Sequence, residues 1–298
     1  MRSVMALVAG VMVIVSPVSV AGWGMDVHRL ITARALDGLP SDLRPLFAAR
    51  RDFVIEHSVD PDLWRVVGLL GEHGAEDPNH FLDIDGLDEP PPFAGVPREW
   101  DAYVARYGTE KANRMGRLPW RVADVYGRLL AAFRDMGTGR SPWAADNARY
   151  LSAVLAHYVE DAHQPFHAAL NYDGQLTGQR GIHSRFETEL VLRNRTSLRL
   201  SPVRIRPIAN ARDDIFARLV EGQALVAPIL DADRRASGGR ERYDDAYYAA
   251  FLDGVRPILE RRLSESASGV ASMIVAAWTE AGRPAVSRAP SPPGLWPH

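Results

Sequence analysis

The 298-residue sequence contains no cysteine. This absence excludes disulfide bonds, a thiolate metal site, a cysteine nucleophile and lipid attachment at an N-terminal cysteine. A strong excess of either charge is also lacking, because 35 Lys and Arg residues nearly balance 37 Asp and Glu residues. The formal net charge of −2 argues against a protein held to nucleic acid by bulk charge, so an anionic substrate would have to be bound by a local site.

Long apolar runs are scarce after the first residues. Residues 4–15 form an uncharged apolar run behind Arg2, and the small residues 20–22 follow it. This pattern predicts a signal peptide over residues 1–22, with cleavage near Gly22 and a secreted or periplasmic product. Pro17 makes the run shorter than the roughly 20 apolar residues of a membrane anchor. No later segment is apolar enough to span a bilayer, so we expect a soluble mature protein without a transmembrane anchor.

The sequence shows no internal repeat, no convincing series of strands and no nucleotide-binding glycine-rich loop. Its hydrophobic fraction of 46% is ample for one core, and the apolar residues recur at helical spacing. Helices are expected over residues 27–39, 52–65, 119–136, from 143 to beyond 157, 211–227 and 244–280, with shorter ones from about 102 and 182. Irregular segments are expected over residues 86–100, 168–182 and 193–212, and a disordered proline-rich tail over 284–298. The pattern predicts a single all-helical domain over residues 23–283.

Residues 157–187 concentrate side chains that bind metals. His157 and Asp161 are four residues apart, as are His183 and Glu187, so each pair projects from one face of a helix. His167 lies between the pairs. One such pair is common on solvated helix faces, whereas two pairs with an intervening histidine favour a metal site. Imidazole and carboxylate are the donors that suit Zn²⁺ when thiolates are absent.

Further candidate ligands lie earlier in the chain. If cleavage follows Gly22, the α-amino group and carbonyl of Trp23 become available to chelate a metal together with His28; alternatively, Trp23 is a buried anchor. Asp60 and Asp62 flank a proline that marks a helix start or turn, and either carboxylate can face inward. His80, in the segment HFLD, is a candidate that the local sequence does not decide.

Taken together and in order, these motifs resemble the zinc-dependent phospholipase C and S1/P1 nuclease superfamily. The shared marks are an opening Trp, an early His, an inner Asp, then HF-x-D, H-x-x-x-D, QP-x-H and H-x-x-x-[DE], which span residues 23–187 of this chain. The resemblance implies a single helical domain that holds three zinc ions at the floor of a cleft. It also implies a monomer that hydrolyses phosphodiester bonds.

The resemblance assigns ligands to each of the three zinc ions. One zinc would be held by Asp62, His80, His157 and Asp161, a second by His167, His183 and Glu187, and the third by Trp23, His28 and a shared Asp161. Asp60, two residues before Asp62, is the alternative to Asp62 in this set. In this scheme Asp161 sets the separation of two metals, and Asp62 positions or deprotonates the attacking water. Zinc lowers the pKa of water toward about 7 and neutralises charge on phosphoryl oxygens.

The substrate class remains open at this stage. The short link between His167 and His183, Glu187 in place of Asp, and Asp26 near the start resemble the phospholipase C branch, which we favour. A phospholipid substrate would imply transient contact with a membrane surface. The step from Trp23 to His28 resembles the nuclease branch, which acts on single-stranded DNA and RNA. Phe81 can stack a base, line an acyl or headgroup pocket, or belong to the core.

A third interpretation is a secreted zinc-binding protein without catalytic activity. Structural zinc sites are usually closed, four-coordinate and often rich in cysteine, whereas the candidate ligands here are histidines, carboxylates and a chain terminus. Three clustered metals also exceed what folding requires. The composition of the ligand set therefore favours an enzyme over a purely structural metal protein.

Overall fold

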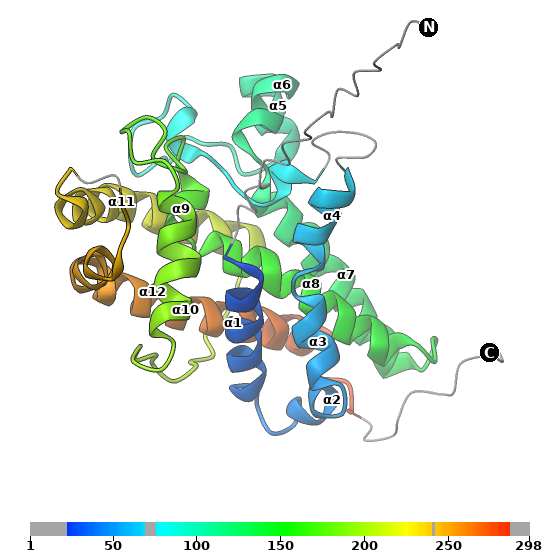
Figure 1. The fold of residues 1–298 in the computed structure, drawn as a ribbon. Coiled ribbons are helices and arrows are strands. Elements are labelled where there is room, and N and C mark those ends of the chain that lie inside the picture. The colour runs from blue at the N-terminus through cyan, green and yellow to red at the C-terminus, as the bar shows by residue number, and fades with distance from the viewer. Residues whose placement is uncertain (1–22, 69–75, 240–241, 287–298) are drawn as a thin grey trace, which may run out of the picture.

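The computed structural model describes residues 23–68, 76–239 and 242–286 (Figure 1). The predicted signal peptide and residues 287–298 of the predicted tail lie outside these residues. In the described residues the chain is helical, and its β-structure is limited to one isolated bridge between Leu82 and Gly116. The prediction of a single all-helical domain is confirmed. In this part of the chain, no helix combines the length and apolar character needed to cross a bilayer.

The helices follow one another with few long connections. They are α1 (Met25–Asp37), α2 (Arg44–Ala48), α3 (Arg51–His57), α4 (Asp60–Gly68), α5 (Trp100–Tyr107), α6 (Thr109–Met115), α7 (Leu118–Thr138), α8 (Ala144–Ala162), α9 (Ile182–Ser184), α10 (Leu190–Asn194), α11 (Ala211–Ser237) and α12 (Asp245–Glu280). Short 3₁₀ and π turns lie between some of them: η1 (Asp77–Asn79), η2 (Ile84–Gly86), η3 (Pro165–Ala168) and η4 (Arg185–Glu189). The proline-rich segment before α5 and the segment between α10 and α11 are irregular, as expected.

Helix α8 is the central element of the fold. It packs against α7 and α12 and also contacts α1, α3 and α11 (Figure 1). Every residue from 152 to 162 is buried. A helix that is buried on all sides normally carries apolar side chains all round. The polar residues His157, Glu160 and Asp161 of this segment therefore need partners in the interior, and they form the centre of the candidate site described below.

The helical segment expected over residues 52–65 contains two helices, α3 and α4, and α4 begins next to Pro61, in agreement with the helix start or turn predicted at that proline. One helix prediction was wrong in its limit. The helix expected to end at residue 227 continues through Pro228 to Ser237. Beyond the proline, α11 still buries apolar residues, including Ile229, and this packing favours its continuation.

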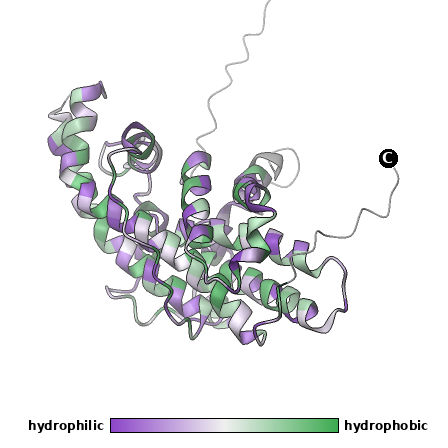
Figure 2. Cartoon of the chain, turned by 90° about the horizontal axis from the view of Figure 1, so that it is seen from below, coloured by the Kyte–Doolittle hydropathy of each residue, from purple (hydrophilic) through white to green (hydrophobic). Residues whose placement is uncertain are grey.

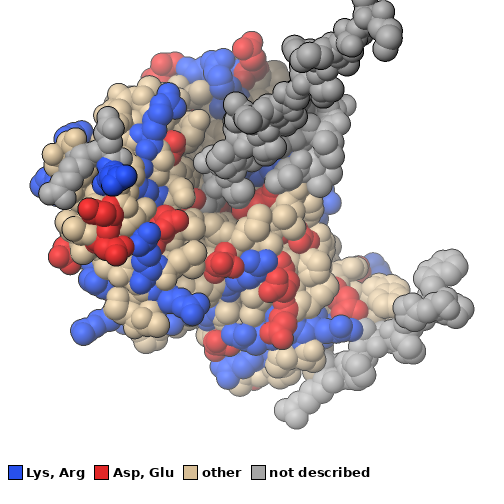
Figure 3. Space-filling model, viewed as in Figure 1, with Lys and Arg blue, Asp and Glu red and all other residues tan. Residues whose placement is uncertain are grey.

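Hydrophobic and hydrophilic residues are distributed as expected for amphipathic helices around a shared core. Figure 2 shows hydrophobic and hydrophilic residues on most of the helices. On the face drawn in Figure 3, Lys and Arg side chains are interspersed with Asp and Glu side chains over the described surface. This mixture agrees with the small net charge of −2. The described surface in that view therefore offers no large area of one sign to an approaching polyanion.

Candidate metal centre

The predicted ligand side chains converge in the interior from separate parts of the chain. Each is at most 6% exposed. Their positions are α1 for His28, α4 for Asp62, the residue after η1 for His80, α8 for His157 and Asp161, η3 for His167, α9 for His183 and η4 for Glu187. Three groups have ligand atoms that all lie within 4.8 Å of one another: His28, Asp62 and His157; His80, His157 and Asp161; and His167, His183 and Glu187.

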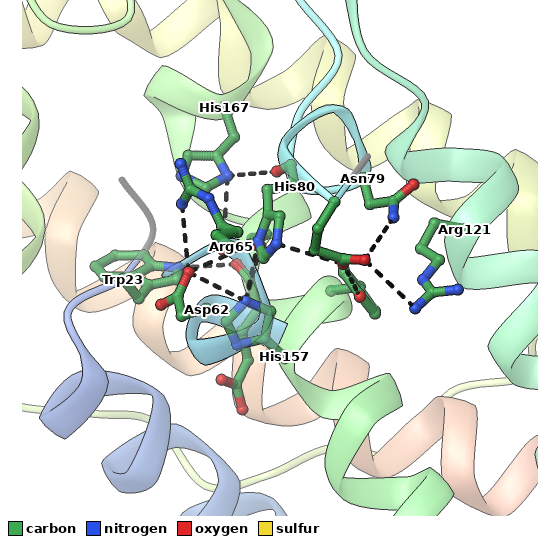
Figure 4. Close-up of polar contacts among 12 residues, drawn as sticks. Trp23, Asp62, Arg65, Asn79, His80, Arg121, His157 and His167 are labelled. Atoms are coloured by element: carbon green, nitrogen blue, oxygen red, sulfur yellow. Dashed lines mark hydrogen bonds and ion pairs between the residues drawn. The ribbon is translucent and has the colours of Figure 1, made fainter. Parts of the chain in front are cut away.

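We call Asp62, His80, His157 and Asp161 the first group, and His167, His183 and Glu187 the second group. The first group is centred on α8. The Nε2 atom of His157 lies 3.3 Å from Oδ2 of Asp161, and Nδ1 of His80 lies 2.9 Å from the same oxygen. The Oδ1 atom of Asp62 lies 3.8 Å from both imidazole nitrogens. The Nδ1 atom of His157 bonds to the Ser58 carbonyl oxygen at 2.8 Å, which turns Nε2 toward the carboxylates. These four residues are the same four that the resemblance implies for one zinc; Asp62, His80 and His157 are labelled in Figure 4.

The structure distinguishes between the two carboxylates around Pro61. Asp62 is buried, with its side chain toward His80 and His157. Asp60 instead contacts His57, at 2.8 Å between Oδ2 and Nδ1, and its side chain is 18% exposed. Of the pair, only Asp62 therefore faces the cluster.

The second group follows the turn after α8. The Nε2 atom of His183 lies 2.9 Å from Oε2 of Glu187, and the His167 and His183 rings are 5.1 Å apart. The connection between His183 and Glu187 runs from α9 into the π turn η4, which differs from the regular helix that we expected. Gln164 donates to Glu187 at 2.8 Å and accepts the backbone N–H of Phe166. Gln164 therefore holds both the turn before His167 and the carboxylate of Glu187.

His28 and His80 lie at different oxygens of the Asp161 carboxylate. The His28 ring stacks on His157 with 4.0 Å between centroids, and its Nε2 atom lies 3.6 Å from Oδ1 of Asp161. The Trp23 side chain is fully buried and donates its indole N–H to the Glu160 carbonyl oxygen at 2.8 Å. The indole is thus an anchor beside the cluster (Figure 4). The α-amino group of Trp23 exists only after cleavage at Gly22, so its role as a ligand stays a prediction.

Unsatisfied polar atoms gather in this cluster. Seven buried atoms of the candidate ligands have no hydrogen-bond partner among the described residues: His28 Nε2, Asp62 Oδ2, His80 Nε2, Asp161 Oδ1, His167 Nε2 and both ring nitrogens of His183. Buried polar atoms without a partner are rare and costly in folded proteins. Imidazole nitrogens and carboxylate oxygens in such positions are suited to coordinate a cation. The residues therefore fit a metal, and this test does not depend on the resemblance.

The ionisation states also suit a cation site. Burial lowers the pKa of His167 and of His183 to about 4, so both imidazoles are neutral near pH 7. Burial alone would raise the pKa of Asp161, but the neighbouring His157 and His167 imidazoles outweigh it and hold that pKa well below its usual range. For His80, burial opposes the shift, but the nearby carboxylates of Asp161 and Glu76 raise its pKa to about 9. A metal bound there would have to displace a proton from His80.

A cavity of about 390 Å³ opens beside the second group. It is lined by Arg65, Asp77, His80, Phe81, Asp83, His167, Tyr172, Asp173, His183, Ser184 and Glu187. Phe81 is therefore part of the cavity wall and available to a ligand. Asp26 is not among the residues that line this cavity; its side chain is 68% exposed and pairs with Arg29.

Sequence reasoning missed three supporting residues. Glu160 is fully buried and contacts His28, and Gln164 holds Glu187. Arg65 contacts Asp77 at 2.7 Å and Asp62 at 3.3 Å, and it reaches the cavity wall. The position of Glu160 beside Asp161, on the buried part of α8, was the available signal. A charged residue on a fully buried helix is expected to have a polar partner.

Comparison with known proteins adds a distant relative. No protein-family model matches the sequence. A probable serine protease from Bradyrhizobium tropiciagri is 24% identical over 228 residues. The match covers 61% of this chain and 28% of that protein, so the chain corresponds to less than a third of that relative's length. Among the described residues, no serine hydroxyl is hydrogen-bonded to a histidine ring.

Proposed function

We propose that this protein is a zinc-dependent hydrolase of phosphodiester bonds, with glycerophospholipids as the first candidate substrate. The observation that carries the proposal is the set of buried ligand atoms without hydrogen-bond partners, from His28, Asp62, His80, Asp161, His167 and His183. The proposed ligand scheme is the one given above, with three zinc ions and a bridging Asp161. The order and spacing of these residues, together with their convergence, support a resemblance to phospholipase C and S1/P1 nuclease.

Zinc suits this donor set because the chain offers imidazole and carboxylate groups and has no thiolate. When bound, zinc ions lower the pKa of water and neutralise charge that develops on the phosphoryl and leaving oxygens. The protein would contribute fixed geometry. Gln164 and the Ser58 carbonyl oxygen each restrain a ligand, at 2.8 Å from Glu187 and His157 respectively. Restrained ligands hold a metal more tightly than mobile ones.

Arg65 is suited to bind the substrate phosphate. Its guanidinium lines the cavity and is held by Asp77 and Asp62 at 2.7 and 3.3 Å. Burial lowers its pKa, but the hydrogen bond to Asp77 and the charges of the two carboxylates outweigh this and raise the pKa, so Arg65 stays charged. A planar guanidinium is the side chain best matched to phosphate oxygens. Asp62, held by Arg65, would orient or deprotonate the attacking water.

The cavity wall favours a phospholipid headgroup. The carboxylates of Asp77 and Asp173 line it, and Tyr172 presents an aromatic ring at 47% residue exposure. Carboxylates and an aromatic face are suited to a cationic headgroup such as choline. A second candidate substrate is single-stranded nucleic acid, because Phe81 also lines the cavity and base stacking on an aromatic ring is worth roughly 1–3 kcal/mol. Stacking would provide affinity without sequence preference.

Two other functions are less well supported. A purely structural zinc protein would have closed sites, whereas His80, His167, His183 and Glu187 all line the cavity. Serine protease activity, suggested by the name of the distant relative, requires a serine activated by an adjacent base. The described histidines have no such hydroxyl partner. Hydrolysis as a reaction class is nevertheless common to serine proteases and to the phosphodiesterase that we propose.

A parallel assay tests the proposal. Protein processed after Gly22 would be incubated with phosphatidylcholine vesicles, single-stranded DNA, RNA and a casein peptide, with and without a chelator. We expect release of phosphocholine that stops with chelator and returns when zinc is restored. Activity on nucleic acid alone would favour the second candidate substrate, single-stranded nucleic acid, over phospholipid. Chelator-resistant cleavage of the peptide, with no turnover of any phosphodiester, would overturn the proposal.

A further inference from the structure

Glu160 occupies an unusual position next to the candidate metal centre. Its side chain is fully buried on α8, and its Oε2 atom lies 2.5 Å from Nδ1 of His28. Its other oxygen, Oε1, accepts the hydroxyl of Thr32 at 2.7 Å. His28 and Thr32 are one turn apart on α1, so a single carboxylate of α8 holds two side chains of α1. Both carboxylate oxygens are thereby used on the side away from the cavity.

This contact determines how His28 faces the cluster. When Glu160 is ionised, its carboxylate only accepts hydrogen bonds, so His28 donates its Nδ1–H, and in the neutral imidazole this leaves the lone pair on Nε2. The Nε2 atom is buried without a hydrogen-bond partner and lies 3.6 Å from Oδ1 of Asp161. The ring is additionally held by stacking on His157 at 4.0 Å. The geometry thus presents a free nitrogen lone pair toward the centre of the cluster.

Packing alone does not account for Glu160. Its carboxylate is fully buried in a segment of α8 that also buries the carboxylate of the next residue, Asp161. Two buried carboxylates in adjacent positions repel each other and lose their hydration, which destabilises the folded protein unless positive charge is nearby. No Lys or Arg forms an ion pair with Glu160 among the described residues; its one ion-pair partner is His28. A cation beyond His28 would compensate both carboxylates.

We infer that Glu160 is a positioning residue for a cation held by His28: it fixes the imidazole with Nε2 toward the cluster and adds negative charge behind it. The inference rests on the proposed function, because the cation is the third zinc of that proposal. Hydrogen bonding from a carboxylate to the distal nitrogen of a metal-binding histidine raises the basicity of the ligand. Loss of such a contact typically lowers metal affinity about 10–100-fold.

Two substitutions separate orientation from charge. Glu160→Ala removes both the acceptor for His28 and the negative charge. Glu160→Gln keeps an oxygen for the Nδ1–H of His28 and a donor for Thr32, and it removes only the charge. We therefore expect the Ala variant to bind the zinc at His28, the third site, about 10–100-fold more weakly than wild type. In the Gln variant we expect a measurable loss of about tenfold or less. Asp233→Asn is the matched control, because Asp233 is also a buried carboxylate but contacts Arg185 and Tyr247.

The experiment is a zinc titration of the metal-free protein, processed after Gly22, against a competing chromophoric chelator. We expect wild type and Asp233→Asn to take up three equivalents with the same affinities. In the Glu160 variants, we expect one equivalent to weaken and two to stay unchanged. A second measurement follows the ¹⁵N shifts of His28 in the metal-free protein, which should report the Nδ1–H tautomer in wild type and its loss in Glu160→Ala.

The outcomes separate this inference from the function on which it rests. Wild-type affinity for all three equivalents in both Glu160 variants would overturn the role of Glu160 and leave the proposed function intact. Equal weakening of all three equivalents would show a merely structural role. A wild-type protein that takes up no zinc would overturn both proposals. If Glu160→Ala does not fold, the third-site affinity of Glu160→Gln decides, and a value equal to wild type contradicts the inference.

Discussion

The Nε2 atom of His157 lies 3.3 Å from the Asp161 carboxylate, one turn further along α8. Both side chains are fully buried, and both contact Nδ1 of His80, at 3.1 and 2.9 Å respectively. In the proposed function, this pair would help to hold one zinc, and Asp161 would be shared with another. The pair is therefore the part of the site whose removal should have the largest effect.

We predict that His157→Ala and Asp161→Asn each lower turnover of the phosphodiester substrate at least 10³-fold, an order-of-magnitude expectation for removing a ligand of a catalytic metal (~4 kcal/mol). Each should also reduce bound zinc, measured by elemental analysis of the purified variant. Asp233→Asn, a buried carboxylate outside the cluster, is the control for general damage. A variant of His157 or Asp161 that keeps full activity and zinc content would refute the assignment of that residue.

Substitutions of the two carboxylates around Pro61 should differ sharply. Asp62 faces His80 and His157 at 3.8 Å, whereas Asp60 contacts His57 and is partly exposed. We expect Asp62→Asn to lower kcat by about 10²-fold or more, a size typical of a lost general base or metal ligand, and Asp60→Asn to stay within about twofold of wild type. Steady-state kinetics on the same substrate measure both. The reverse order of effects would show that the wrong carboxylate was assigned.

Much of this arrangement could be predicted from the sequence, because helical spacing and the order of motifs are local properties. The His157–Asp161 and His183–Glu187 pairs could be predicted because the two members of each pair are four residues apart. The local sequence did not decide between Asp60 and Asp62, since that choice depends on which side of α4 packs against α8. Glu160 was missed for a related reason: its importance comes from the approach of α1, more than 120 residues earlier in the chain, as the 132-residue separation from His28 shows.

The limits of two elements also depended on tertiary packing. Pro228 suggested an end to the helix that begins at residue 211, yet the burial of Ile229 and Leu230 supports another ten residues of α11. At residues 185–189, a π turn replaces the regular helix expected there. Neither feature has a local signal strong enough to overcome the ordinary preferences of proline and of helical residues.

Acidification should release zinc in steps. Burial lowers the pKa of His167 and His183 to about 4, below the ordinary value near 6.5, so protons compete for these nitrogens only near pH 4. Burial opposes protonation of His80, but the nearby carboxylates of Asp161 and Glu76 raise its pKa to about 9. Protons therefore compete with a metal for His80 already at neutral pH. We expect the His80 group to lose zinc first as pH falls, and the second group to retain it to about pH 5. Zinc content after dialysis at pH 7, 5.5 and 4 measures this, and complete loss in one step above pH 6 would contradict it.

Asp83 gives a prediction about stability that does not involve metal. Its buried position and the nearby charge of Asp85 raise its pKa to about 8. In the unfolded chain this pKa is about 3.9, so between about pH 4 and 8 the folded protein keeps a proton that the unfolded chain releases. The free energy of unfolding should therefore fall as pH rises through this window, by at most about 1.4 kcal/mol per pH unit.

Asp83→Asn removes this dependence. We expect the metal-free variant to be more stable than wild type at pH 9, by on the order of 1 kcal/mol or more, and to differ much less at pH 5. Urea unfolding at the two pH values measures the difference. Asp101→Asn, at an exposed position of α5, should show no such pH-dependent gain. Equal stability of Asp83→Asn and wild type at pH 9 would show that Asp83 ionises normally in the folded protein.

The central claim is that buried imidazoles and carboxylates hold three zinc ions in one cluster. Anomalous diffraction at the zinc absorption edge, from crystals of protein processed after Gly22 and grown without chelator, tests it most directly. The account predicts three anomalous peaks among His28, Asp161 and Glu187. Crystals grown with added zinc that show no peak among these side chains, or peaks only at the molecular surface, would contradict it.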